Sequence, residues 1–382
     1  MEQVGEPSTP EAPVPHGQAD RVAAITRALG EQYRLGVGPE GGVAVLGRGG
    51  MATVYLGEDA RHDRWVAVKV MHPEIVASIG SQRFLREIRI AAQLHHPHIL
   101  GLIDSGESGG VLWYVMPFVS GESLRSRIEA RGAMPVSDVV RLIRDVASAL
   151  ARAHKAGIVH RDIKPENILL EDRHALVTDF GVAKALSDAS KVSDTSVGFA
   201  LGTPAYMAPE QAAADVIDHR ADLYALGIVA YEMLTGSLPF DAKTPQQMIA
   251  AHMARPPLPL AGKRADIPPA LTHIVMRCLE KDPEDRWQSA DALLAELDEV
   301  PIGTGTHASP TAAYPTQTPA APTLTTPTPA TTAAAAPAEP AASVSPAPAR
   351  PALGGLTRWI GVAAIAALAL LAILGRGCGA AP

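Results

Sequence analysis

Apolar residues recur at intervals of three and four along several stretches of the chain, the spacing of one face of an α-helix. The clearest stretch predicts a helix over residues 137–156, followed by Gly157, a residue type that commonly ends helices. The same spacing predicts shorter helices at 19–29 and 81–94, and an apolar run predicts another at 223–234. The predicted buried face of the longest helix is formed by Val139, Ile143, Val146, Leu150 and Ala153.

Short apolar runs bounded by glycine-rich or charged turns predict β-strands. Two of them enclose a charged turn in the middle of the chain, and the others lie in its first third. The runs are at 43–46, 54–56, 66–69, 111–118, 168–170 and 175–177.

The overall charge argues against one class of partner. Lys and Arg number 33 against 40 Asp and Glu, a formal net charge of −7 over 382 residues, and no basic stripe is visible. Nucleic acid is therefore not an expected partner. The two cysteines, Cys278 and Cys378, are too few for a disulfide framework and suit a reducing compartment. Residues 1–18 lack the apolar core of a signal peptide and are expected to be disordered.

The C-terminal part of the sequence changes composition sharply. Residues 299–355 are rich in Pro, Ala and Thr and predict a disordered linker. An uncharged run of about 25 Å in helical length, from Trp359 to Gly375, then lies between two arginines. It predicts a membrane-spanning helix at 357–376 with a short tail at 377–382 and no outer sensor domain. A buried or surface-lying helix is the alternative.

A polar octet divides two apolar segments in the middle of the chain. Residues 160–167 read HRDIKPEN, and 179–181 read DFG after a short strand. Two short strands would bring Asp162, Asn167 and Asp179 into one small volume with a lysine. Oxygen-bearing side chains and a lysine together indicate metal-assisted phosphate chemistry. A solvated, charge-rich turn is the simpler alternative.

A glycine-rich stretch supplies a second candidate site for phosphate. Residues 47–52 read GRGGMA between two short strands, and the next strand ends in Lys69. Glycines let the backbone approach phosphate oxygens without a Cβ in the way. A lone glycine-rich hairpin is weak evidence, but its pairing with a strand that ends in lysine is much stronger.

Together with residues 208–210, which read APE, these motifs resemble the signature set of eukaryotic-type (Hanks-type) protein kinases. The resemblance is greatest to bacterial membrane-anchored Ser/Thr kinases and covers roughly residues 33–297. It implies an α+β, bilobal protein-kinase fold at 31–298, with an N-lobe at 31–117 and a helical C-lobe at 120–298. A short helix at 19–30 would precede it and pack against the N-lobe.

The resemblance implies an ATP site between the lobes. Glu87 is assigned to pair with Lys69, although it could instead be a solvated partner for a neighbouring Arg. Ala52 stands where the family has a third glycine, Pro117 replaces a common acid, and residues 36–42 look like an insertion in the first strand. The nucleotide-binding residues implied are Leu46, Gly47, Arg48, Gly49, Gly50, Met51, Ala52, Val54, Ala67, Lys69, Glu87, Met116, Pro117 and Val119.

The resemblance also assigns catalytic roles. Asp162 would accept the proton of a Ser or Thr hydroxyl, and Lys164 would neutralise charge on the transferring phosphoryl group. Asn167 and Asp179 would hold Mg²⁺, with Mn²⁺ as a substitute. The lysine at 164 and residues 202–204, which read GTP, resemble the Ser/Thr branch. Structural roles fall to Glu210 and Arg286, as a pair, and to Asp222, which would brace the 160–167 loop.

Residues 182–201 are polar, and a loop of that length is either functional or disordered. The resemblance makes it an activation segment, with autophosphorylation expected at Thr195 or Ser196 and Arg161 as the phosphate's partner. The resemblance and the predicted span together imply a single-pass Ser/Thr protein kinase of the cell membrane. Its catalytic part would be cytoplasmic, its substrates would be proteins, and a homodimer is possible. The alternatives are a pseudokinase that acts as a binding module, a small-molecule phosphotransferase and a tail-anchored scaffold.

Overall fold

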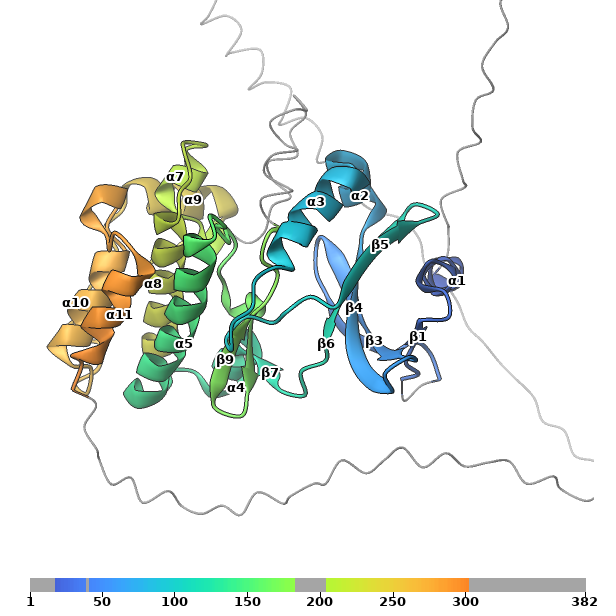
Figure 1. The fold of residues 1–382 in the computed structure, drawn as a ribbon. Helices are drawn as coiled ribbons and strands as arrows, with labels where there is room; N and C mark the ends of the chain where they lie inside the picture. Colours follow the sequence, from blue (N-terminus) through green and yellow to red (C-terminus); the bar gives the residue numbers. More distant parts are fainter. Residues whose placement is uncertain (1–17, 39–40, 183–203, 302–382) are drawn as a thin grey trace, which may run out of the picture. The chain divides into compact units, whose positions relative to one another are not determined.

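The computed structural model describes residues 18–38, 41–182 and 204–301, all within one compact unit that runs to His307. In this unit a β-sheet with three helices comes first in the sequence, and a mainly helical part follows (Figure 1). The predicted linker beyond residue 301, the predicted span at 357–376, and the candidate phosphorylation sites Thr195 and Ser196 lie outside the described residues. Val300 is buried in the core, so the packed part of the chain extends past the predicted start of the linker at 299.

The first part is built on a six-stranded antiparallel sheet in the order β1-β3-β4-β6-β5, with β2 paired to β3 beside this path. Long apolar stretches in β3, β4 and β6 make these the central strands. The strands are β1 Tyr33–Leu35, β2 Val45–Arg48, β3 Ala52–Asp59, β4 Arg64–Met71, β5 Asp104–Ser108 and β6 Val111–Pro117.

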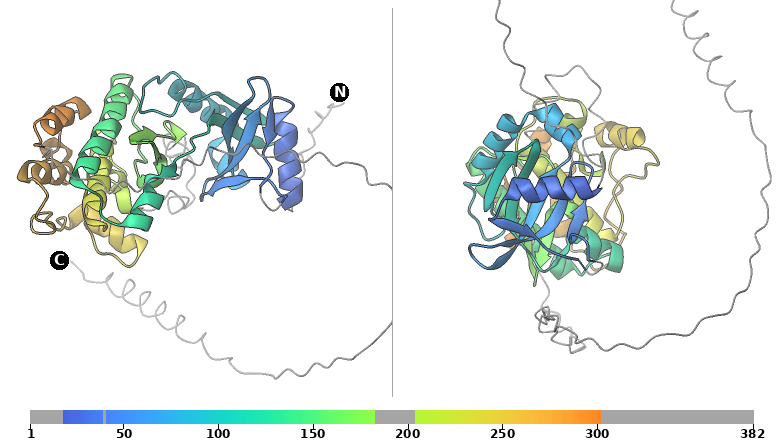
Figure 2. Two further views of the ribbon diagram at one scale, coloured as in Figure 1. Left: turned by 90° about the horizontal axis from the view of Figure 1, so that it is seen from below. Right: turned by 90° about the vertical axis from the view of Figure 1, so that its right-hand side faces the viewer.

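Strand alternation divides the side chains of this sheet between two apolar clusters. In β6, Leu112 and Tyr114 are buried against α3 (Ser81–Ala91), whereas Trp113 and Val115 are buried in the cluster that contains Ile25 of α1 (Gln18–Leu29). Figure 1 and the right-hand view of Figure 2 show α1 lying across the sheet on the side away from α3. The predicted N-terminal helix is therefore present and packs on the N-lobe.

Two details of this part differ from the sequence-based expectation, and a third agrees with it. The helix α2 (Pro73–Ile79) was not predicted, and α3 ends at Ala91 instead of 94. The first strand is split into β1 and β2, because the intervening segment folds into a small hairpin in which the Gly38 N–H donates to the Gly42 carbonyl. The glycine-rich segment 36–42 is thus an excursion in the first strand, as predicted.

The second part is built around two buried helices, α5 (Val136–Lys155) and α8 (Arg220–Thr235), which pack on each other. All five apolar positions predicted for the α5 face are buried. A small antiparallel sheet, β7-β8-β9, lies beside α5. The remaining elements are β7 Glu122–Ser123, α4 Leu124–Arg131, η1 Pro165–Asn167, β8 Ile168–Glu171, β9 His174–Val177, η3 Pro204–Tyr206, α7 Pro209–Ala212, α9 Pro245–Ala254, α10 Pro269–Cys278, η4 Pro283–Asp285 and α11 Ala290–Asp298.

None of the helices in the described part of the chain is both long and apolar enough to cross a membrane.

A buried ion pair joins the start of α7 to the segment before α11. The Arg286 guanidinium, fully buried, donates to both carboxylate oxygens of Glu210 at 2.8 Å. It also donates to the carbonyls of Glu280 and Lys281 at 2.8 and 2.9 Å. A two-pronged, hydrogen-bonded contact of this kind is the geometry that compensates the cost of burying both charges.

We expect Arg286→Leu to lower the free energy of unfolding by about 3–5 kcal/mol, because it leaves the Glu210 carboxylate buried without its partner. Urea denaturation followed by circular dichroism measures the change. The double variant Glu210→Leu/Arg286→Leu should lose less than the sum of the single variants, since no unpaired charge remains. Lys155→Ala, which removes the exposed Lys155–Asp291 pair, is the control and should cost no more than about 1 kcal/mol. Equal losses at the two sites would contradict the prediction.

Candidate functional site

The 160–167 loop is held in place by one buried carboxylate. Asp222, at the start of α8, accepts the backbone N–H groups of His160 and Arg161 at 2.8 and 2.7 Å. Its Oδ2 also contacts His154 Nε2 at 2.8 Å. Burial acts to raise the pKa of Asp222, but these hydrogen bonds and the neighbouring histidines hold it below its ordinary value. The carboxylate therefore stays charged and fixes Arg161 in a left-handed conformation, φ +67°.

Three polar side chains of this loop, Asp162, Lys164 and Asn167, form one hydrogen-bonded group. Lys164 Nζ lies 2.7 Å from Asp162 Oδ2. The Asn167 amide donates to the same oxygen at 3.0 Å and to the Asp162 carbonyl at 2.8 Å. The Asp162 carboxylate is thereby oriented by an amide and an ammonium, and its side chain is still 29% exposed. A reactant that enters from solvent can reach it.

Backbone contacts attach this group to the second motif, residues 179–181. The Thr178 N–H donates to the Asn167 carbonyl at 2.9 Å. His160 Nε2 donates to the Thr178 carbonyl at 2.8 Å, and its ring packs edge-on against Phe180 with centroids 4.6 Å apart. The structure thus brings Asp162, Asn167 and the turn at Asp179 together, although they are separated along the chain.

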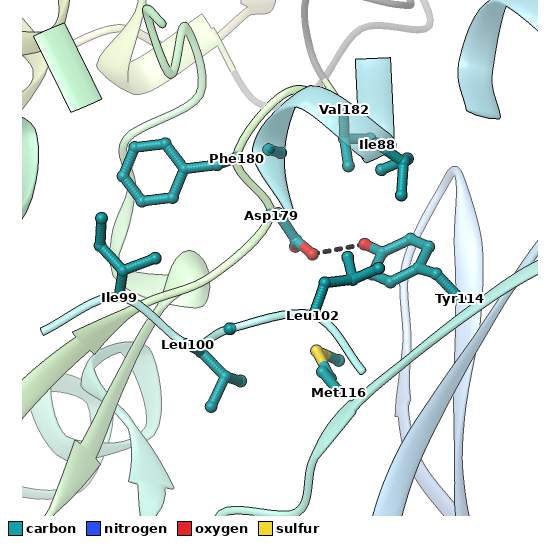
Figure 3. Close-up of a pocket in the computed structure, with 11 residues that line it drawn as sticks. Ile88, Ile99, Leu100, Leu102, Tyr114, Met116, Asp179, Phe180 and Val182 are labelled. Carbon is teal, nitrogen blue, oxygen red and sulfur yellow. Dashed lines mark hydrogen bonds between the residues drawn. The ribbon is translucent and has the colours of Figure 1, made fainter. Parts of the chain in front are cut away.

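Asp179 connects this region to the sheet. Lys69 Nζ lies 2.6 Å from Asp179 Oδ2, and the Tyr114 hydroxyl donates to Oδ1 at 2.5 Å (Figure 3). Burial acts to raise the pKa of Asp179, but the Lys69 charge and the two hydrogen bonds hold it below its ordinary value. Burial and the charge of Asp179 raise the pKa of Tyr114 well above its ordinary value, so the hydroxyl remains a donor.

The structure pairs Lys69 with Asp179, and the predicted contact between Lys69 and Glu87 stays a prediction. Glu87 lies on α3, whose backbone approaches the 179–181 turn: a Cβ on Gly181 would meet the Glu87 carbonyl at 3.2 Å. Asp179 has a second donor, Tyr114, in this position.

The glycine-rich turn is tighter than predicted. Strand β2 extends through Arg48, and β3 begins at Ala52, whose methyl group is buried in the apolar cluster with Phe84. The Ala52 side chain therefore faces the sheet core, and a contact with the nucleotide through its backbone stays a prediction. A Cβ on Gly47 or Gly50 would meet no protein atom within 4 Å. The protein's own packing does not require glycine there, which fits a role in leaving room for a ligand.

The other predicted nucleotide-binding residues lie on neighbouring strands. Val54 of β3 is opposite Lys69 of β4, and Ala67 of β4 is opposite Met116 of β6. Pro117 pairs with Val66 at the last position of β6, where a missing N–H is tolerated. Leu46 and Arg48 on β2 are exposed, whereas Met51 and Val119 are partly buried. Met116, Asp179 and Phe180 also line a small cavity of about 20 Å³ (Figure 3).

The donor atoms suit a nucleotide with a divalent ion. The Asn167 amide nitrogen is engaged with Asp162, so its oxygen remains an acceptor, and Asp179 supplies carboxylate oxygens. Hard cations such as Mg²⁺ prefer these ligands. Lys69 and the open backbone of the glycine-rich turn offer positive charge and N–H donors of the kind that phosphates require. The residues present therefore fit both groups.

Two contributors to the site were not predicted. Tyr114 lies in an apolar strand and reads as a core residue, so only the three-dimensional structure shows its contact with Asp179. His72 follows β4 and contacts the Gly50 carbonyl and the Thr53 hydroxyl, each at 3.2 Å. These two contacts hold the glycine-rich turn, and no sequence pattern predicted this role of His72.

We expect Tyr114→Phe to tighten the binding of ATP with its metal ion by about tenfold. The reason is that the hydroxyl competes for an Asp179 oxygen, and a hydrogen bond to a charged group contributes about 1.5–3 kcal/mol. Calorimetric titration of the purified chain with Mg·ATP measures it. Tyr55→Phe is the matched control, since Tyr55 belongs to the apolar cluster on the α1 side of the sheet. Unchanged or weaker binding in Tyr114→Phe would contradict the prediction.

Comparison with known proteins agrees with this geometry. Residues 42–296 match the protein kinase domain family. Serine/threonine-protein kinase PknB of Mycobacterium leprae is 38% identical over 281 residues, which cover 72% of this chain and 44% of that protein. Serine/threonine-protein kinase pkn2 of Myxococcus xanthus is 40% identical over 259 residues, 66% of this chain and 31% of that protein.

Serine/threonine-protein kinase pkn3 of Myxococcus xanthus is 38% identical over 268 residues, 67% of this chain and 49% of that protein. In these alignments the chain spans less than half the length of each curated relative. The family match covers most of the chain and includes both lobes, the 160–167 loop and the 179–181 turn. The chain therefore belongs to the protein kinase family, whose members use ATP and a divalent metal ion.

Proposed function

We propose that this chain is an ATP- and Mg²⁺-dependent protein kinase that phosphorylates Ser and Thr residues of proteins. One observation carries the proposal: Asp162, Lys164 and Asn167 form a single hydrogen-bonded group within 2.7–3.0 Å. A pseudokinase or scaffold has no need for such an oriented carboxylate. The names of the similar proteins, each a serine/threonine-protein kinase, favour Ser and Thr over Tyr.

In this mechanism Asp162 accepts the proton of the substrate hydroxyl at its carboxylate and orients the oxygen towards the phosphoryl group. Lys164, beside that carboxylate, offsets the charge that develops on the transferred group. Lys69 holds nucleotide phosphates, and the Gly47–Gly50 turn supplies backbone donors. Asn167 and Asp179 are the residues that would hold Mg²⁺, which when bound neutralises charge between the phosphates. Mn²⁺, with the same ligand preference, would substitute.

The Lys69–Asp179 contact must open for this chemistry. Both groups are required by the nucleotide and its metal ion, yet here they neutralise each other at 2.6 Å. Binding of the nucleotide would exchange the Asp179 carboxylate for phosphate oxygens on Lys69 and place a metal ion on Asp179. Lys69 would then be available to Glu87, the partner that the sequence motif suggests.

We further propose autophosphorylation of Thr195 or Ser196. Both lie in the 183–203 segment, outside the described residues, between the 179–181 turn and α7. A phosphate there would be a charge partner for Arg161, which precedes Asp162 and whose backbone is held by Asp222. Such a contact would link the phosphate directly to the loop that carries the proposed base.

The uncharged run at 359–375 supports a second proposal, single-pass anchoring in the cell membrane by a helix at 357–376, with the catalytic part in the cytoplasm, where ATP is available. The run lies outside the described residues, so the support is the sequence alone. A homodimer also remains a prediction, because only one copy of the chain is described.

We expect Asp162→Asn to lower phosphate transfer to a generic protein substrate by about 10²–10⁴-fold while binding of Mg·ATP persists, because the variant loses a general base and keeps the nucleotide contacts. Radiolabelled ATP measures the transfer. Asp172→Asn, the same change at the exposed β8–β9 turn, is the matched control and should retain activity. Mapping of phosphopeptides in the unchanged chain should find Thr195 or Ser196 modified.

Equal transfer by Asp162→Asn and the unchanged chain would exclude Asp162 as the base. Binding of Mg·ATP without transfer in the unchanged chain would instead indicate a binding module. Phosphopeptides that contain neither Thr195 nor Ser196 in modified form would remove the autophosphorylation proposal alone.

We expect the full chain to sediment with membranes and to resist extraction at high salt, whereas a chain that ends at residue 301 should remain in the supernatant. The Leu368→Arg variant keeps the full length of the chain and should be released from membranes more easily, because a charge at the centre of a span costs about 2.5–3.5 kcal/mol on insertion. Immunoblots of the fractions measure the distribution. Extraction of the full chain by salt would contradict a spanning helix.

A further inference from the structure

Two histidines and a buried aspartate meet outside the site described above. His98 lies in the loop between α3 and β5, Asp145 lies on α5, and His174 is the first residue of β9. One possible ligand atom from each lies within 4.8 Å of the other two. Among residues 18–38, 41–182 and 204–301, no other group of three His, Cys, Asp or Glu residues meets this condition.

The hydrogen bonds of His98 decide which of its nitrogens is available. Its Nδ1 lies 3.0 Å from the Ala175 carbonyl oxygen, which can only accept, so Nδ1 carries the proton. In the neutral ring Nε2 then presents its lone pair, and it faces Asp145 Oδ1 at 3.4 Å. Two acceptors facing each other at this distance require a cation between them or a second proton on the ring.

The distances suit a zinc ion. In a tetrahedral site with bonds of about 2.0–2.1 Å, ligand atoms lie about 3.3–3.4 Å apart. His98 Nε2 is 3.4 Å from Asp145 Oδ1, and His174 Nδ1 is 3.3 Å from Asp145 Oδ2, so each histidine is at this separation from one oxygen of the same carboxylate. The His174 side chain is 62% exposed at the end of a short hairpin, so it can turn to close the third side.

Surrounding contacts orient the ligands in the way that zinc sites require. The Ala175 N–H donates to Asp145 Oδ2 at 3.0 Å, so neighbouring backbone groups of one residue position both Asp145 and His98. His96 Nδ1 accepts the backbone N–H of His98 at 3.1 Å, and His96 Nε2 contacts the Ser148 hydroxyl. Both nitrogens of His96 are therefore engaged, which leaves three ligands and an open position towards solvent beside His174.

We propose that His98 Nε2, the Asp145 carboxylate and His174 Nδ1 bind a Zn²⁺ ion, with water completing the coordination. Imidazole with carboxylate favours Zn²⁺ over Mg²⁺, which prefers oxygen alone. The three ligands come from three separate elements. The ion therefore links α5 and β9 to the loop that precedes β5.

The place of the site gives the ion a structural effect on the strand that leads to Asp179. The Val177 N–H donates to the His98 carbonyl at 2.9 Å, and the Leu100 N–H donates to the Val177 carbonyl at 2.9 Å. Zinc on His98 and His174 would tie together the two segments of this parallel pairing. The bound ion should hold the backbone that positions Asp179, without contact with the reacting groups.

The test is calorimetric titration of the full chain, prepared without an affinity tag and treated with EDTA, with ZnCl₂ in excess Mg²⁺. We expect one zinc ion per chain, and about 100-fold or greater loss of affinity in His174→Ala, since loss even of an outer partner costs 10–100-fold. His62→Ala is the matched control: His62 is equally exposed and contacts Asp59, but has no third ligand. It should leave the affinity unchanged.

A second measurement does not depend on that variant. Co²⁺ in place of zinc should give visible absorption bands of a four-coordinate site, absent in His98→Gln, and saturating Zn²⁺ should raise the melting temperature by on the order of 5 °C. Zinc binding that survives unchanged in both His174→Ala and His98→Gln would overturn the proposal. So would the absence of stoichiometric zinc binding, which would make the cluster a protonated His98–Asp145 ion pair.

Discussion

The carboxylate of Asp222 is fully buried, and its favourable contacts are with backbone N–H groups of the 160–167 loop and with His154. A charge in the protein interior is costly unless donors compensate it, and the loop supplies those donors. These contacts hold Arg161 in a left-handed conformation, which costs about 1–3 kcal/mol and persists only when its surroundings impose it. The geometry of Asp162, Lys164 and Asn167 therefore depends on the contacts between Asp222 of α8 and the loop backbone.

Asp179 occupies a comparable strained position, also at φ +67°, but its partners come from the sheet. Lys69 and Tyr114 both hold its carboxylate, and both must share it with any metal ion that enters. The site thus has one half held by Asp222 and one half held by contacts from the sheet. In the proposed mechanism only the second set of contacts changes when the nucleotide binds.

The sequence predicted most of what depends on short-range spacing. The 160–167 octet, the 179–181 turn and the helical face of α5 each follow from patterns within about 20 residues. The direct ion pair between Lys69 and Asp179 did not, because these residues are far apart in the sequence and the fold brings them together. The site contacts of Tyr114 and Asp145 were not predicted either. Tyr114 lies in an apolar strand and Asp145 in an amphipathic helix, and their periodicity predicts only burial. Contacts between distant segments were thus the part that required a structure.

The helix α1 covers an apolar face of the sheet that would otherwise meet water. Ile25, Leu29 and Tyr33 are each less than 5% exposed, and they pack in the cluster that includes Trp113 and Val115. All three precede residue 42, where the match to the kinase family begins. Expression of the family segment alone would uncover that face and remove β1 from the sheet edge. The segment that matches the family is therefore shorter than the packed unit of this chain, which includes α1 and β1.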